Sequence, residues 1–285
     1  MAEPTQHFFQ SQRLRLSYWE WGSADRPPLL LLHGGRDHAR QWDRVAEAFA
    51  AEYHVLALDL RGHGDSDWDP AGAYGVAENM LDLVRLLEIA GEPAVVLGHS
   101  YGGQITLATA ATYPEHFTKV AVIEGTSSVT PLGYTDEMGP GWLRRWGDLM
   151  REFEQEGNQR VYPSVEAAAQ RMREANPRLP ADLVPMIAGY AVRPAEGGFV
   201  WKFDTWVHGR TSMAIRRAEL PHFWSAIACP VLLFYGTDSR AAQAPAEAPH
   251  FRDLRQVIVQ DAAHWVHHEQ LPTVVRELRA FLDKP

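Results

Sequence analysis

Short apolar runs alternate along the chain with stretches in which apolar residues recur at helical spacing. The runs with the length and composition of strands are Arg13–Trp21, Leu29–His33, His54–Asp59, Ala94–His99, Lys119–Ile123, Val231–Tyr235 and Arg255–Gln260. The inner runs consist almost entirely of Val, Leu, Ile and Ala, as expected for strands that are covered on both faces. Strands that alternate with helices favour an α/β fold, with a mostly parallel central sheet and helices on both of its faces.

The spacing of apolar residues clearly indicates two helices, one between predicted strands and one after the last of them. Val76–Leu87 carries apolar residues three and four positions apart, and Gly91 with Pro93 ends this helix. Val274–Leu282 shows the same spacing and predicts a final amphipathic helix. Each of these helices is expected to cover the sheet with its apolar face.

The pattern changes between residues 126 and 228. The helical patterns in this segment are Trp142–Glu156, Ser164–Glu174 and Ala181–Tyr190. Pro and Gly separate them, and no strong buried strand appears until the strand pattern resumes at Val231. We therefore predict a core formed by residues 1–125 and 229–285, with a helical cap, residues 126–228, inserted between the two halves of the sheet.

A candidate nucleophile lies between a buried strand and a helix. Residues 98–102 read GHSYG, a G-x-S-x-G motif that follows the apolar run Ala94–Leu97 and precedes a helical stretch at Gly103–Tyr113. A sharp strand-to-helix turn needs small residues on both sides, because a Cβ atom there would collide with the neighbouring chain. The string alone is a weak signal, and an ordinary tight turn is the alternative. Its context favours Ser100 as a nucleophile raised above the sheet.

Two further motifs accompany this one. Residues 32–35 read LHGG after the second predicted strand, and residues 59–66 read DLRGHGDS after the third. Together with GHSYG they make the chain similar, over nearly its whole length, to the esterase-like serine hydrolases of the α/β-hydrolase superfamily. The resemblance implies the α/β-hydrolase fold, with the cap inserted after the sixth strand. The motifs are specific to the superfamily but not to a substrate.

The resemblance also implies an oxyanion hole, in which backbone N–H groups stabilise the negative charge of an acyl-transfer intermediate. One donor is expected to be the N–H of Tyr101, the residue after the nucleophile. The other is expected from the loop after the LHGG strand, with Gly35 as the first choice and Arg36 as the second. We also expect the side chains of Tyr101 and Trp265 to contact substrate.

The expected general base is His264. The chain has 13 histidines, so only position can decide among them. Residues 261–265 read DAAHW, after the last predicted strand, and this is where the superfamily carries its catalytic histidine. His267 and His268 lie three and four positions further on and are expected to project elsewhere.

Two carboxylates compete for the third role, which is to orient the imidazole and stabilise its protonated form. Most relatives carry an Asp three residues after a Gly at the end of the second-last strand. Counted from Gly236, that position is Ser239, and Asp238 comes one position earlier. Some relatives, including haloalkane dehalogenases and certain small esterases, carry the acid just after the preceding strand, where this sequence has Glu124. We favour Glu124, because a carboxylate that ends a buried strand needs a partner, and Asp238 is the alternative.

Composition limits the partners and cofactors that the chain is expected to bind. The net charge of −9 leaves no basic footprint for nucleic acid or for an anionic membrane surface. Cys229 is the only cysteine, which excludes an internal disulfide and, with no signal-peptide pattern, leads us to expect a cytoplasmic protein. No Cys/His cluster with metal spacing and no phosphate-binding Gly loop appears, so we expect no cofactor and no metal. The pattern predicts no particular oligomeric state.

The function expected from these features is hydrolysis of a small to medium, apolar carboxylic ester or lactone through an acyl-enzyme. The serine disfavours dehalogenase and epoxide-hydrolase chemistry, because relatives with those activities carry Asp at the same turn. Hydrolysis of a C–C, thioester or amide bond by the same residues stays an alternative. An alternative of another class is a pseudoenzyme that only binds a small molecule.

Overall fold

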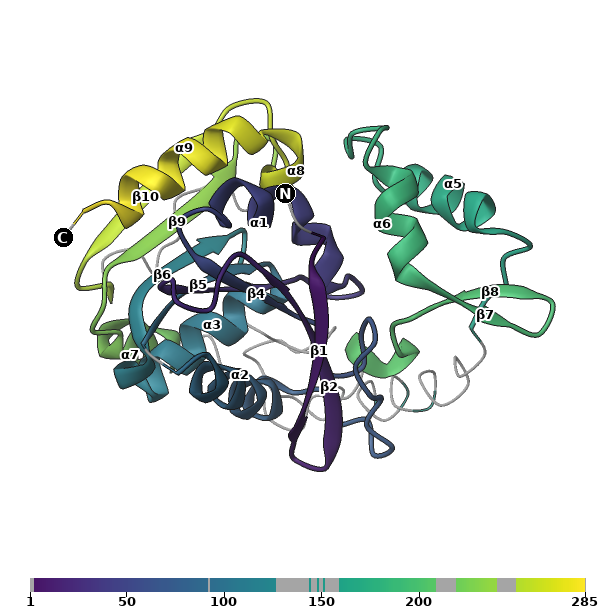
Figure 1. Cartoon of the computed structure of the whole chain (residues 1–285), viewed down its shortest axis with the longest axis horizontal. Coiled ribbons are helices and arrows are strands. Elements are labelled where there is room, and N and C mark those ends of the chain that lie inside the picture. Colours follow the sequence, from purple (N-terminus) through teal and green to yellow (C-terminus); the bar gives the residue numbers. More distant parts are fainter. Residues whose placement is uncertain are drawn as a thin grey trace.

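The computed structural model describes residues 3–91, 93–126, 159–208, 219–239 and 250–284, together with the single residues 144, 148 and 151. At its centre lies an eight-stranded sheet with the strand order β1-β2-β4-β3-β5-β6-β9-β10 (Figure 1). The strands are β1 (Thr5–Ser11), β2 (Leu14–Trp21), β3 (Pro28–Leu32), β4 (His54–Leu58), β5 (Ala94–His99), β6 (Phe117–Ile123), β9 (Val231–Gly236) and β10 (Leu254–Val259). β2 pairs antiparallel with β1 and with β4, and the remaining pairs are parallel.

The mostly parallel α/β sheet predicted from the sequence is confirmed. Each of the seven predicted strands is present, with ends that agree to within two residues. β1 was not predicted, because only Phe9 and Ser11 among its seven residues are buried and its apolar pattern is weak. With β1 included, Phe117–Ile123 is the sixth strand, and the segment predicted as a cap follows it.

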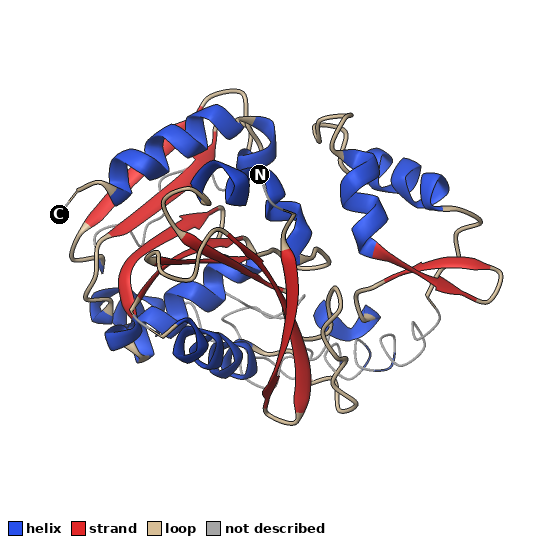
Figure 2. Cartoon of the chain, in the orientation of Figure 1, coloured by secondary structure: helices blue, strands red, loops and turns tan. Residues whose placement is uncertain are grey.

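Helices cover both faces of the sheet (Figure 2). One face carries α2 (Val76–Ala90), α3 (Tyr101–Thr112) and α7 (Leu220–Ala226), and the other carries α1 (Asp43–Phe49), α8 (Val266–Glu269) and α9 (Leu271–Leu282). Short 3₁₀ helices occupy Ala39–Trp42 (η1), Pro114–His116 (η2) and Thr205–His208 (η3). In β3, Leu30 and Leu32 pack against the first group of helices, whereas Leu29 and Leu31 pack against the second. Because both faces are covered, the strand is apolar throughout.

The cap segment contains more than helices. The predicted helices at Ser164–Glu174 and Ala181–Tyr190 correspond to α5 (Val165–Ala175) and α6 (Val184–Ala191), which lie beside the sheet in Figure 1. They are followed by a hairpin of β7 (Val192–Ala195) and β8 (Gly198–Trp201) that was not predicted. Three of the four residues of β7 are exposed, so this strand lacks an apolar pattern.

Two other parts of the range predicted as a cap, residues 126–228, do not match the prediction directly. Trp142–Glu156, predicted as a helix, lies outside the described residues apart from 144, 148 and 151. α7 falls inside the predicted cap range but packs against the core, where Trp224 stacks on Phe251 with ring centroids 5.4 Å apart. The exact cap boundaries therefore stay a prediction.

Candidate active site

Ser100 occupies a strained turn between β5 and α3. Its φ and ψ angles are 50° and −115°, a conformation that a non-glycine residue adopts only when the surrounding structure enforces it. The N–H of Ser100 donates to the carbonyl oxygen of Ile123 at 2.9 Å, and its own carbonyl oxygen accepts from the N–H of Gln104 at 3.1 Å. A Cβ atom on Gly102 would lie 2.5 Å from the carbonyl oxygen of His33. The predicted strand–turn–helix arrangement is therefore present, and its glycine is needed for packing.

Glu124 follows β6, the strand next to β5. Its N–H donates to the carbonyl oxygen of Phe234 at 3.0 Å, which fixes the backbone against β9. Its side chain is only 1% exposed. The Oε1 atom accepts the N–H of Gly236 at 2.8 Å, and Oε2 accepts a hydrogen bond from the hydroxyl of Ser239. The buried carboxylate thus has the partners that its burial requires.

His264 lies on the loop between β10 and α8, beside Glu124 and His99. Its Nδ1 atom is 3.9 Å from Oε2 of Glu124. Its carbonyl oxygen is 2.9 Å from Nε2 of His99, and the two rings lie 4.7 Å apart. Because His99 directly precedes Ser100, the structure gathers Ser100, His264 and Glu124 at the carboxyl edge of the sheet.

Asp238 lies elsewhere. Its side chain is 49% exposed and pairs with Arg178, with Oδ2 2.9 Å from Nη1. Its N–H donates to the carbonyl oxygen of Ala262 at 2.9 Å. No hydrogen bond or ion pair joins Asp238 to His264 among the described residues. Of the two carboxylates considered from the sequence, Glu124 is the one beside His264.

The loop after β3 holds the residues expected to form the oxyanion hole. Arg36 has a φ angle of 62°, and its N–H donates to Nε2 of His63 at 3.0 Å. The Nδ1 atom of His63 lies 3.0 Å from the carbonyl oxygen of Arg61, so it carries the proton when Nε2 accepts. The N–H of Arg36 is therefore already engaged. The N–H of Gly35 donates to no other described residue.

His33 holds the same loop in a similar way. Its Nε2 atom accepts the N–H of Leu60 at 3.0 Å, and its Nδ1 atom lies 2.6 Å from the carbonyl oxygen of Gly34. Burial lowers the pKa of His33 to about 3, so the ring is neutral at physiological pH. The rings of His33 and His63 lie 5.1 Å apart. Two imidazoles thus tie the loop after β3 to the loop after β4. The LHGG and DLRGHGDS motifs contain His33 and His63 but do not show these contacts.

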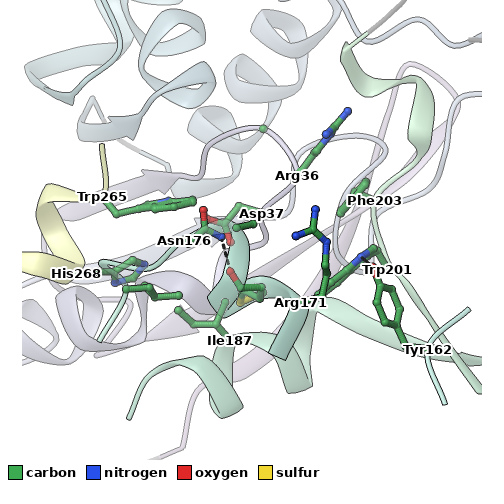
Figure 3. A pocket seen from close by; sticks show the side chains of 14 residues that line it. Arg36, Asp37, Tyr162, Arg171, Asn176, Ile187, Trp201, Phe203, Trp265 and His268 are labelled. Atoms are coloured by element: carbon green, nitrogen blue, oxygen red, sulfur yellow. Dashed lines mark hydrogen bonds between the residues drawn. The ribbon is translucent and has the colours of Figure 1, made fainter. Parts of the chain in front are cut away.

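A pocket of about 400 Å³ opens beside the site (Figure 3). Gly35, Arg36, Asp37, Trp265 and His268 line it from the core. The residues that line it from the cap segment are Tyr162, Arg171, Met172, Ala175, Asn176, Leu179, Ile187, Trp201, Phe203. Figure 3 shows Trp265 and His268 on one side and the aromatic rings of Tyr162, Trp201 and Phe203 on the other. The pocket is therefore bounded by the Gly35 loop and by the residue after His264.

The contact of Tyr101 with substrate, expected from the sequence, stays a prediction. The hydroxyl of Tyr101 donates to the carbonyl oxygen of Tyr74 at 2.5 Å and accepts from Asn79 at 3.2 Å, and its ring packs partly against the core. Asp37, in the loop after β3, lines the pocket. Desolvation, with a smaller contribution from the charge of Asp59, raises the pKa of Asp37 to about 7. Its titration near neutral pH could not be seen in the sequence.

The described part of the chain has no ready-made site for a metal ion. No three His, Cys, Asp or Glu side chains are grouped there so that they could hold one. Among the same residues, no helix combines the length and the apolar character needed to cross a lipid bilayer.

Known proteins share this architecture. An esterase of Mycobacterium tuberculosis is 28% identical over 288 aligned residues, which cover 94% of this chain and 86% of the esterase. Epoxide hydrolase A of the same organism is 28% identical, with 99% of this chain and 98% of that protein covered. The crystal structure of a thioesterase domain from the curacin biosynthetic pathway superposes with a TM-score of 0.86 at 20% identity, covering 98% of this chain and all of that domain, which is a likeness of fold alone.

These relatives act on different bonds, so the likeness does not choose among them. The α/β-hydrolase fold family model matches residues 27–271, which includes both parts of the sheet and the segment between them. This chain is a member of the α/β-hydrolase fold family.

Proposed function

We propose that this chain is a serine hydrolase that cleaves a small to medium, apolar carboxylic ester or lactone. The observation that carries the proposal is the grouping of three side chains at one edge of the sheet. Ser100 stands at the strained turn, His264 packs against His99, the residue before Ser100, and the buried carboxylate of Glu124 lies 3.9 Å from the His264 ring. A nucleophile, a base and an orienting acid are the groups that acyl transfer requires.

The reaction proceeds in two halves. The Oγ atom of Ser100 attacks the carbonyl carbon of the substrate while Nε2 of His264 takes its proton, and Glu124 stabilises the imidazolium that forms. The N–H groups of Gly35 and Tyr101 donate to the oxyanion. His264 then protonates the leaving alcohol, which leaves an acyl group on Ser100. Water, activated by His264, releases the acid and restores the enzyme, and the cycle needs no cofactor.

Gly35 is a better second donor than Arg36. Because the N–H of Arg36 donates to His63, it can serve an oxyanion only if that hydrogen bond breaks. Among the described residues, no acceptor competes for the N–H of Gly35, and Gly35 lines the pocket. A donor that is already oriented and unpaired stabilises developing charge without a cost of reorganisation.

The pocket supports a substrate of limited size with an apolar part. Its volume of about 400 Å³ lies within the range of small-molecule sites, and Trp201, Phe203 and Trp265 provide aromatic walls. Epoxide opening is disfavoured because it depends on a carboxylate nucleophile in this superfamily, and the chain has Ser100 in that place. Thioester, amide and C–C bond hydrolysis use the same groups and are alternatives within the same site.

A substrate panel tests the proposal. Purified protein should be assayed with p-nitrophenyl esters of increasing acyl length, with lactones, and with a matched thioester, amide and β-diketone. We expect turnover of short esters or lactones to exceed that of the other classes. If kcat/KM is higher for the thioester, the amide or the β-diketone than for the esters and lactones, the chain is instead a hydrolase of that bond. If no member is turned over and the protein binds a substrate analogue unchanged, the pseudoenzyme alternative is favoured.

A further inference from the structure

Arg178 connects the cap segment to the core. It stands in the loop between α5 and α6, and its guanidinium contacts three separate parts of the core. Its Nε atom lies 2.5 Å from Oε2 of Glu269 in α8, and its Nη1 atom lies 2.9 Å from Oδ2 of Asp238 after β9. Its Nη2 atom donates to the carbonyl oxygen of Asp261 after β10 at 2.8 Å. One side chain thus joins the cap segment to the loop after β9 and to the stretch from the end of β10 to α8.

One of these partners holds the loop that carries His264. The same Oε2 atom of Glu269 that pairs with Arg178 accepts the N–H of Ala263 at 3.1 Å. Ala263 directly precedes His264. The carbonyl oxygen of Asp261, to which Arg178 donates, belongs to the same loop. Arg178 therefore contacts this stretch at Asp261 directly and at Ala263 through Glu269.

A second partner lies next to the residue that contacts Glu124. Asp238 donates its N–H to the carbonyl oxygen of Ala262 at 2.9 Å, so the loops after β9 and β10 are bonded to each other. Ser239, the next residue, donates its hydroxyl to Glu124. The contact between Arg178 and Asp238 is thus one residue away from the bond that orients Glu124.

Because the side chain of Glu269 is buried, removal of Arg178 is expected to displace the loop that carries His264. The side chain of Glu269 is 5% exposed, and a carboxylate that loses its partner in such a place must rotate toward solvent or draw water in. Either response disturbs the bond from Glu269 to Ala263. The separation of 3.9 Å between His264 and Glu124 already exceeds a hydrogen bond, so a small displacement of the loop changes whether this contact can form.

We propose that Arg178 is a positioning residue that clamps the cap segment onto the His264 loop and thereby sets the placement of His264 relative to Glu124. This inference rests on the proposed function, because it assumes that His264 and Glu124 act together. It gives Asp238 a role as a partner of the cap segment.

The test compares Arg178→Met with a matched control. Met keeps an unbranched stem and removes the guanidinium. Arg44→Met is the control, since Arg44 in α1 pairs at 2.5 Å with Asp182 of the same cap loop, and its side chain is 40% exposed against 44% for Arg178. With p-nitrophenyl acetate as substrate, Arg178→Met should lower kcat by about tenfold or more with a smaller change in KM. Arg44→Met should change kcat by less than about twofold.

Two further measurements sharpen the comparison. Arg178→Lys keeps the charge but cannot reach three partners at once, so its kcat should lie between those of the wild type and Arg178→Met. The rate of labelling of Ser100 by a fluorophosphonate should fall in parallel with kcat. If Arg178→Met does not fold, the kcat of Arg178→Lys tests the proposal. A kcat of Arg178→Lys equal to that of the wild type overturns the proposal.

The remaining outcomes are distinguishable. If Arg178→Met and Arg44→Met lower the melting temperature equally and leave kcat unchanged, Arg178 only supports the cap and the inference is wrong. A rise in KM with an unchanged kcat assigns Arg178 to substrate entry and also overturns it. An unreactive, folded wild type contradicts the proposed function itself and the clamp with it.

Discussion

The Oε2 atom of Glu124 lies 3.9 Å from Nδ1 of His264 and accepts a hydrogen bond from the hydroxyl of Ser239. Ser239 stands where most relatives carry the acid. In this chain the carboxylate beside His264 comes from the end of β6, which pairs with β9 in parallel register from Val120 to Ile123. Because β6 and β9 are neighbours, a side chain from either strand can reach the same place beside His264.

Replacement of the acid tests this arrangement. Glu124→Gln keeps the size of the side chain but removes the charge that stabilises the imidazolium. We expect kcat to fall by about 10³-fold or more, since the corresponding change in a well-studied triad costs about 10⁴-fold. Asp238→Asn, at a half-exposed ion pair, should cost at most about fivefold. A large loss in Asp238→Asn together with a small one in Glu124→Gln would exchange their roles.

A carboxylate introduced at the neighbouring position should restore activity. In Glu124→Gln/Ser239→Asp, the new Asp stands where most relatives carry the acid. We expect kcat to recover by at least about tenfold relative to Glu124→Gln, because the charge again lies within a few ångströms of His264. Glu124→Gln/Thr237→Asp is the control, since Thr237 directs its hydroxyl to the N–H of Asp261. Equal recovery in both double variants would show that only net charge matters.

The hydrogen bond from Arg36 to His63 predicts a role for a histidine outside the reacting groups. His63→Leu removes the acceptor and frees the loop after β3. We expect kcat to fall by about tenfold to 100-fold with a smaller change in KM, because the donor at Gly35 loses its placement. His54→Leu is the matched control, since His54 is also buried but contacts Glu20, away from the loop. Equal losses of kcat in both variants would contradict this role.

Buried histidines predict that acid destabilises the fold. Burial lowers the pKa of His33, His38 and His268 to about 3, and it holds the pKa of His99 and His267 well below the usual value. The unfolded chain therefore binds more protons than the folded one between pH 3 and about 6.5. The free energy of unfolding should fall as pH falls through this window, by about 2 kcal/mol per uncompensated histidine between pH 6.5 and 5.

Two carboxyl groups, those of Asp37 and Asp59, have the opposite effect on the dependence of stability on pH. Desolvation raises the pKa of Asp37 to about 7 and that of Asp59 to about 6, so their contribution to stability is lost as pH rises through those values. The histidines outnumber them, and urea unfolding at pH 7 and pH 5 should show the lower stability at pH 5. His268→Gln should reduce the dependence on pH. A stability that is equal or greater at pH 5 contradicts this balance.

The sequence predicted those features whose causes are local. The sheet strands show as unbroken apolar runs because they are covered on both faces, and the turn at Ser100 shows because close packing leaves no room for a Cβ atom at Gly98 or Gly102. His264 was found by its place after the last strand. β1 and the hairpin of β7 and β8 were missed because most of their residues are exposed or only partly buried.

The features that the sequence could not predict depend on contacts between distant segments. The choice between Glu124 and Asp238 is a matter of which side chain faces His264, and the partners of Glu124 lie more than one hundred residues away. The role of His63 depends on which ring nitrogen faces the N–H of Arg36. The contacts of Arg178 bring together segments that no motif connects.

Labelling with a fluorophosphonate tests the central claim most directly, because the reagent forms a bond only with an activated serine hydroxyl. Wild-type protein should gain the mass of one probe, and peptide mapping should place it on Ser100. Ser100→Ala should fold normally by circular dichroism and remain unlabelled. A folded wild type that resists the probe, or a Ser100→Ala variant that is labelled as fast as the wild type, would contradict the assignment of Ser100 as the nucleophile.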